Sequence, residues 1–193
     1  MSGEPNGRSD GDLLRATLDG DEESFLEIYR RHCDRIYRFA YRMTGSPDAA
    51  RDVTHSCFVG LLERPSGYDG QRASLGTYLC GAARHLCLRS ASRSWREREL
   101  SPSPDLRPAR GPSPLQVLLE DERARMVREA LVALAPLHRE VLILAEYEEL
   151  DLATVAEIVG AEVGAVKVRL HRARRKLRAA LEAHMRSGAL AVE

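Results

Sequence analysis

The side chains with the clearest chemical potential are the basic ones close to the C-terminus. Between Gly160 and Arg186 the only acidic residues are Glu162 and Glu182. The basic residues of this stretch are Lys167, Arg169, Arg172, Arg174, Arg175, Lys176, Arg178 and Arg186. The formal net charge of zero therefore hides a basic C-terminal end. Such an end is the usual electrostatic signature of a nucleic-acid contact, and a solvated helical face is the alternative interpretation.

These basic residues lie in a segment whose pattern predicts a helix-turn-helix. Asp151 suits the N-cap of a short helix ending at Val159, and Gly160 suits the left-handed turn that follows. A second helix is expected from about Val163 to Ala183, because apolar residues recur there at steps of three and four. Its other face presents Gly164, Lys167, Val168, His171, Arg172 and Arg175. A helix of this kind can enter a major groove, although plain helical packing would give the same pattern.

Two His-x-Cys pairs are the other candidates for chemistry. His55 with Cys57, and His85 with Cys87, could suggest a metal or redox site. Side chains two positions apart on a helix point in different directions, so we expect neither a metal nor a cofactor. The sequence contains no HExxH, no Gly-rich phosphate loop and no recognisable Ser/His/Asp arrangement. We therefore expect that the protein is not an enzyme and has no small-molecule substrate.

The elements that would position these residues are helices. Ala, Leu, Arg and Glu dominate the 193 residues, and aromatic residues make up only 5%, which favours an all-α fold. One helix is expected through Phe25 and Met43, ending at Gly45-Ser46-Pro47. Ser46 would cap the next helix, which would end before Pro65, and a third helix would begin near Leu75.

Prolines separate two helical blocks. Five of them fall between residues 102 and 114, so an extended Pro-rich linker is expected between two small helical domains. The expected division is a disordered or short N-terminal segment over 1–19, a first domain over 20–93, a linker over 94–114, a second domain over 115–183 and a tail over 184–193. The residues before position 12 look disordered.

The expected compartment follows from what the sequence lacks. No run approaches the roughly 18 apolar residues that cross a bilayer, and the polar N-terminus does not resemble a signal peptide. We expect a cytoplasmic protein without membrane insertion, whose cysteines are mostly reduced.

Four motifs resemble one known family. The run GAEVGAVKVRLHRAR at 160–174 is similar to the C-terminal domain of extracytoplasmic-function (ECF) sigma factors, and LAPLHREVLIL at 134–144 resembles the segment before it. The run AARDVTHSCF at 49–58 and LGTYL at 75–79 resemble the N-terminal domain of the same factors. The resemblance covers roughly residues 20–183. It implies sigma region 2 in the first domain and a helix-turn-helix sigma region 4 in the second.

The resemblance implies a function in transcription initiation. The chain would bind core RNA polymerase through the β′ clamp helices and the β flap, recognise −10 and −35 promoter elements, and assist promoter melting. Promoter DNA and an anti-sigma factor would be its other partners. The implied polymerase-binding residues are Asp48, Asp52, Thr54, His55, Phe58 and Leu61.

The resemblance also implies two DNA-binding sets. The −10 element would be read by Tyr68, Arg72, Ser74, Thr77, Tyr78, Arg84, His85 and Arg89, because a flipped base needs a stacking surface and a single strand needs a basic groove. The −35 element would be read by Gly164, Lys167, Val168, Arg169, His171, Arg172, Arg174 and Arg175.

The chain departs from the family pattern at several positions. Arg51 and Ser56 replace acidic residues, so the implied docking helix is less acidic than usual. Tyr78 replaces a tryptophan and keeps an aromatic face. Val168 replaces a serine on the implied reading helix, which favours contact with a thymine methyl group.

Two other classes of protein compete with this interpretation. A stand-alone helix-turn-helix regulator would explain the second domain but not the first, and would usually bind palindromes as a dimer. An adaptor that sequesters another regulator would make the basic helix incidental. Run-off transcription with core polymerase separates all three, because only a sigma factor confers a defined start site.

Overall fold

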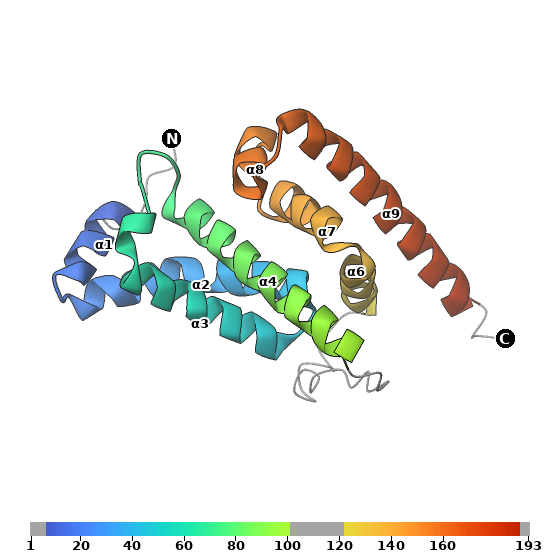
Figure 1. Ribbon diagram of the computed structural model, residues 1–193, viewed down its shortest axis with the longest axis horizontal. Helices are drawn as coiled ribbons and strands as arrows, with labels where there is room; N and C mark the ends of the chain where they lie inside the picture. The colour runs from blue at the N-terminus through green and yellow to red at the C-terminus, as the bar shows by residue number, and fades with distance from the viewer. Residues whose placement is uncertain (1–6, 101–121, 190–193) are drawn as a thin grey trace.

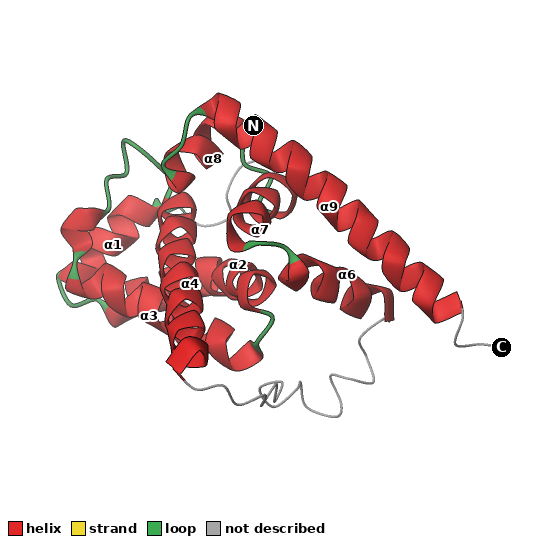
Figure 2. Cartoon of the chain, turned by 45° about the vertical axis from the view of Figure 1, so that its right-hand side comes forward, coloured by secondary structure: helices red, strands yellow, loops and turns green. Residues whose placement is uncertain are grey.

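The computed structural model describes residues 7–100 and 122–189, which we call the front half and the rear half. Helices and short turns make up both ranges, and the described residues contain no strand (Figures 1 and 2). The predicted all-α fold is confirmed.

The front half is a helical bundle around the long helix α2. Its elements are α1 (Asp10–Leu18), α2 (Glu22–Thr44), α3 (Pro47–Glu63), the 3₁₀ turn η1 (Pro65–Gly67) and α4 (Leu75–Leu100). Helices α3 and α4 both pack on α2. The apolar periodicity predicted this packing, because Ile28, Ile36 and Phe39 on one face of α2 are fully buried.

The corner between α2 and α3 forms as the sequence predicted. Gly45 ends α2 in the left-handed conformation with φ of 71°. The Ser46 side chain then accepts a hydrogen bond from the Ala49 amide at 3.3 Å, with Pro47 in the first turn of α3. An N-cap hydroxyl and a proline at this position both favour the start of a helix.

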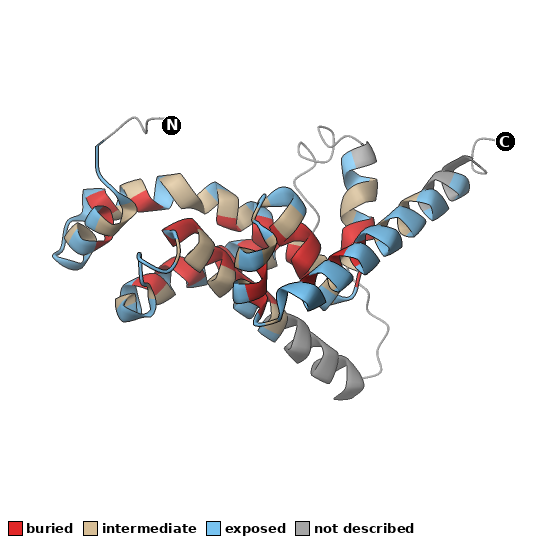
Figure 3. Cartoon of the chain, turned by 90° about the horizontal axis from the view of Figure 1, so that it is seen from above, coloured by how far each residue is buried: buried red, intermediate tan, exposed pale blue. Residues whose placement is uncertain are grey.

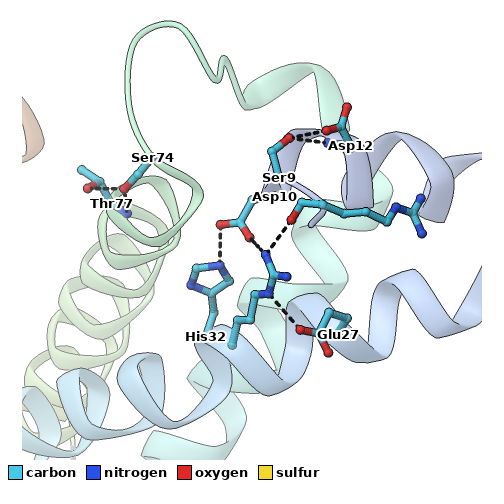
Figure 4. Close-up of polar contacts among 9 residues, drawn as sticks. Ser9, Asp10, Asp12, Glu27, His32, Ser74 and Thr77 are labelled. Atoms are coloured by element: carbon cyan, nitrogen blue, oxygen red, sulfur yellow. Dashed lines mark hydrogen bonds and ion pairs between the residues drawn. The ribbon is translucent and has the colours of Figure 1, made fainter. Parts of the chain in front are cut away.

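Helix α1 was not predicted as a separate element, and of the expected disordered or short N-terminal segment over 1–19 the disorder is wrong for 10–18. Leu13 and Leu14 are buried against the bundle. Asp10 accepts hydrogen bonds from Arg31 at 3.1 Å and pairs with His32 at 2.8 Å (Figure 4). These tertiary contacts stabilise a nine-residue helix that is too short to be stable alone.

Helix α4 is longer than the sequence predicted. It continues to Leu100, so the expected linker over 94–114 is wrong for its first seven residues. The first proline of that stretch stands at 102, and the residues before it are good helix formers. The rest of the linker, and the predicted start of the second domain at 115, lie outside the described residues.

The rear half carries the helix-turn-helix. Its elements are α6 (Glu122–Ala133), α7 (Pro136–Leu142), the π-helical turn η2 (Ile143–Tyr147), α8 (Leu152–Val159) and α9 (Val163–Ala189). As predicted, Asp151 caps α8 by accepting from the amides of Ala153 and Thr154, and Gly160 is left-handed with φ of 65°. Helix α9 runs beyond the predicted Ala183, so the expected tail over 184–193 begins as helix.

The two halves pack together. Helix α2 contacts α6, α7 and η2, and one apolar core runs through both halves (Figure 3). In the described part of the chain no helix has the length and apolar character needed to cross a membrane.

Candidate nucleic-acid interface

Helix α9 has one buried face and one exposed basic face. Val166, Leu170 and Ala173 are buried against the rest of the rear half. The predicted reading residues Gly164, Lys167, Val168, His171, Arg172 and Arg175 are all exposed. A major groove could therefore reach this face without rearrangement of the rear half.

The remaining two predicted residues of α9 are more constrained. Arg169 is half-buried. Arg174 is exposed, but its guanidinium donates to the Glu146 carboxylate, with Nε at 2.8 Å. A phosphate contact by Arg174 would have to displace this carboxylate.

The positive charge of α9 acts on a neighbouring imidazole. Burial lowers the pKa of His138, and the nearby charges of Lys176, Arg172 and Arg169 lower it further. The buried Nδ1 atom of His138 has no hydrogen-bond partner among the described residues. The neutral imidazole of His138 therefore lies within the positive electrostatic field of α9. An approaching phosphate backbone would meet the same field.

A hollow between the two halves, lined mainly by the front half and on one side by Glu157 and Ile158 of α8, gathers most of the predicted −10 residues. The rings of Tyr68 and Tyr78 lie 5.5 Å apart at 56°, beside a cavity of about 390 Å³. Arg72, Thr77 and His85 line the same cavity. The cavity thus combines aromatic faces with basic and polar groups, as a site for an unstacked base requires.

Three other predicted −10 residues have different surroundings. Ser74 caps α4, accepting from the Thr77 amide at 3.2 Å and sharing a hydrogen bond with the Thr77 hydroxyl (Figure 4). Arg84 is buried and pairs with Glu140 of the rear half. Arg89 is exposed on α4. Arg84 therefore cannot touch DNA in this conformation, contrary to expectation.

The predicted polymerase-binding set divides between surface and core. Asp48, Asp52 and His55 are exposed. Thr54, Phe58 and Leu61 are buried at 4%, 2% and 1% exposure, so they face the bundle and not a partner. The prediction that these three residues bind polymerase is therefore wrong: the exposed face of α3 instead carries Val59 and Leu62, at 36% and 38% exposure. Helical periodicity could have identified Val59 and Leu62 as exposed, because each directly follows a buried position of α3.

The two His-x-Cys pairs do not bring their histidines and cysteines to one place. His55 and His85 are exposed, whereas Cys57 and Cys87 are buried in the front-half core. Within the described ranges, no three His, Cys, Asp or Glu side chains gather as metal ligands would.

Family comparison matches both halves. Residues 28–97 match the family model described as Sigma-70 region 2, and residues 124–177 match Sigma-70, region 4. The chain belongs to the sigma-70 family. The order of the two regions is the order that the sequence motifs predicted, and the region 4 match contains the exposed basic face of α9.

Curated relatives of this sigma-70 family member include ECF sigma factors. It is 31% identical over 163 residues to the ECF RNA polymerase sigma factor SigE of Mycolicibacterium smegmatis, covering 83% of this chain and 63% of SigE. It is 27% identical over 174 residues to the ECF sigma factor SigW of Bacillus subtilis, covering 86% and 92%. The resemblance to ECF sigma factors is confirmed.

Solved structures agree on the fold. The sigma factor RpoE of Bartonella quintana, in complex with the anti-sigma factor NepR, matches with a TM-score of 0.65 and 22% identity, covering 83% of this chain and 98% of RpoE. CnrH, in complex with the cytosolic domain of CnrY, matches with a TM-score of 0.66 and 20% identity, covering 91% and 99%.

Proposed function

We propose that this sigma factor binds core RNA polymerase and directs it to promoters by recognising two DNA elements, −10 and −35. The observation that carries the proposal is the occurrence of region 2 and region 4 in one chain, with the basic face of α9 open to solvent. The proposed action consists of binding and positioning, and the polymerase performs the chemistry.

In this proposal α9 reads the −35 element from the major groove. Lys167, Arg172 and Arg175 supply charge for base edges and phosphates. Val168, 49% exposed among these polar neighbours, would contact a thymine methyl group. Gly164, Arg169, His171 and Arg174 complete the proposed set.

The hollow beside Tyr68 and Tyr78 would capture unstacked bases of the −10 element. Stacking of a base on an aromatic ring contributes about 1–3 kcal/mol, which can offset part of the unpairing that promoter melting requires. Arg72, Thr77 and His85 line the hollow, and Arg89 lies on the same helix as Tyr78. Ser74 would act by capping α4 and not by touching DNA.

The exposed face of α3 is the proposed docking surface for the polymerase clamp helices of β′. It comprises Asp48, Asp52, His55, Val59 and Leu62, and we call it the α3 face. Val59 and Leu62 offer apolar area, and the two aspartates offer charge for steering. The rear half would contact the β flap.

An anti-sigma factor is the proposed regulatory partner. RpoE, which shares this fold, was solved with the anti-sigma factor NepR bound. We also propose that the protein acts in the cytoplasm, where the polymerase and the promoter are.

In vitro transcription tests the proposed function. Purified chain and core polymerase are incubated with fragmented genomic DNA of the source organism, and transcript 5′ ends are mapped. We expect start sites that core polymerase alone does not give, each preceded by a shared pair of sequence elements. Binding to duplex DNA without new start sites would instead indicate a stand-alone regulator.

A further inference from the structure

Helix α4 carries a glycine, Gly81, in its interior. The helix begins at Leu75 and continues to Leu100, so Gly81 is well inside it. Glycine is the poorest helix former after proline, because it loses the most backbone freedom when it becomes helical. A glycine at such a position therefore calls for a reason in packing or in function.

Packing does not explain Gly81. A Cβ atom placed there would meet no heavy atom of the described residues within 4 Å outside its own helix and chain neighbours. Gly76 in the first turn of α4 is different, because a Cβ atom there would meet Arg35 Nη1 at 2.6 Å. Nor is Gly81 one of the glycines with a positive φ, as Gly45 is. The fold would therefore accept an alanine at position 81.

The space beside Gly81 belongs to the hollow that contains the proposed −10 residues. Gly81 and Ala82 line this hollow, and so do Tyr78 and His85 on the same helix. Residues at these spacings share one face of a helix. The face thus has an aromatic ring at each end and the two smallest side chains between them.

The spacing along this face suits a nucleobase. Seven residues of helix separate Tyr78 from His85, which is about 10.5 Å along the axis. Stacked bases lie about 3.4 Å apart along a strand, so a base with one ring on each side needs about 7 Å. The interval between Tyr78 and His85 therefore has room for one base, provided that no side chain fills it.

The loop before α4 holds the aromatic end of this face in place. A Cβ atom at Gly67 would meet the Tyr78 hydroxyl at 3.0 Å, and one at Gly70 would meet the Tyr68 hydroxyl at 3.2 Å. The two tyrosine rings also contact each other, with centroids 5.5 Å apart. The rings are thus fixed before DNA arrives, and a preformed surface loses less freedom on binding.

We propose that Gly81 is a specificity-determining residue of the −10 site, because its missing side chain leaves the space in which one unstacked base lies against α4 between Tyr78 and His85. Glycine is the residue that allows a ligand to approach a backbone closely. The proposal rests on the proposed function, since it names a further residue of the same DNA site. In this view α4 retains a poor helix former in order to keep the space open.

Filling the space tests the inference. Gly81→Ala adds one methyl group and Gly81→Leu adds a larger side chain, and both new residues are better helix formers than glycine. Thermal unfolding of each full-length variant should therefore show a midpoint no lower than that of the wild type.

The matched control is Gly60→Ala in α3. Gly60 is also inside a helix, and a Cβ atom there would meet nothing within 4 Å. It does not line the hollow. The control therefore makes the same chemical change with the same gain in helix propensity, away from the proposed base.

The measurement uses core polymerase loaded with each variant. One probe is promoter DNA with a duplex −35 element and a single-stranded −10 element, and a second probe is the same promoter as a full duplex. In a further series of the first probe, each base of the −10 strand is replaced in turn by an abasic site. Fluorescence anisotropy gives the affinity for each probe.

We expect Gly81→Ala to weaken binding to the single-stranded −10 probe about tenfold, the size of one lost base stack, and Gly81→Leu to weaken it further. Affinity for the full duplex and for core polymerase should not change, and Gly60→Ala should match the wild type throughout. One abasic position should weaken wild-type binding but have no added effect in Gly81→Leu, because the two changes remove the same contact.

Two results would overturn the role of Gly81. One is wild-type affinity of both Gly81 variants for the single-stranded −10 probe. The other is weaker binding by Gly81→Leu in which every abasic position keeps its wild-type effect. If the wild-type complex itself shows no preference for the single-stranded −10 probe over the full duplex, the proposed function fails, and this inference fails with it.

Discussion

At the residue scale, Arg172 offers the most direct test of the reading face of α9. Its side chain is exposed on the same face as Lys167 and Val168. If it contacts a base edge, Arg172→Ala should weaken binding to a −35-containing promoter by about 1–3 kcal/mol and relax sequence preference at one position. Competition between matched and mutated −35 duplexes measures this. Equal preference in mutant and wild type would remove Arg172 from the base-reading set.

The cysteines allow a second prediction at this scale. Burial raises the pKa of Cys57, Cys80 and Cys87 to about 12 each, so at pH 8 roughly one in ten thousand of each would be thiolate. Only the thiolate reacts quickly with alkylating reagents. We therefore expect iodoacetamide to modify the half-buried Cys33 first.

Peptide mass spectrometry of the folded protein measures the order of labelling, with guanidinium-unfolded protein as the control. Labelling of all four cysteines at one rate in the folded protein would contradict the buried assignment and reopen the question of a redox role.

At the element scale, helix α3 allows the stability of the fold and the docking of polymerase to be tested separately, because its two faces have different surroundings. Phe58 is in the core, so Phe58→Ala should lower the free energy of unfolding by about 3–5 kcal/mol. Val59, the next residue, is on the α3 face, so Val59→Asp should leave stability within about 0.5 kcal/mol and weaken polymerase binding. Denaturant unfolding and a polymerase pull-down on both variants measure the two effects. Unchanged polymerase binding by Val59→Asp would count against docking through α3.

The same helix illustrates what sequence could and could not predict. Periodicity located α2, α3 and the helix-turn-helix, and local chemistry at Ser46, Asp151 and Gly160 located their boundaries. Family motifs indicated which segments bind, but they do not separate the inward from the outward face, so Thr54, Phe58 and Leu61 were assigned to the wrong one. Helix α1 depends on contacts of Asp10 with Arg31 and His32, which join residues about twenty positions apart and leave no local pattern.

At the scale of the whole molecule, the contact between the halves was not predictable from sequence. A proline-rich linker indicates two domains but not whether they touch. The pairing of Arg84 with Glu140 joins residues 56 positions apart, and each alone resembles an ordinary charged residue on a helix. The structure therefore adds a contact between the halves to a function that sequence motifs could already suggest.

Two glycines give a probe of that contact. Gly45 and Gly160 share a left-handed backbone, with φ of 71° and 65°, so alanine should strain both by a similar amount, about 1–2 kcal/mol. Only at Gly45 would the new methyl group meet the other half, at Val132. We expect Gly45→Ala to enlarge the radius of gyration and Gly160→Ala to leave it unchanged. Equal radii for the two variants would count against a tight junction at α6.

The most direct test of simultaneous reading of two elements is transcription from a promoter of altered spacing. Inserting five base pairs between the mapped −35 and −10 elements turns one relative to the other by about half a helical turn. If polymerase holds both halves on the promoter at once, output from the mapped start site should fall to the level of a promoter without a −35 element, and a ten-base-pair insertion should not restore it. Unchanged output after the five-base-pair insertion would contradict the account, because it would mean that the two halves do not bind the promoter together.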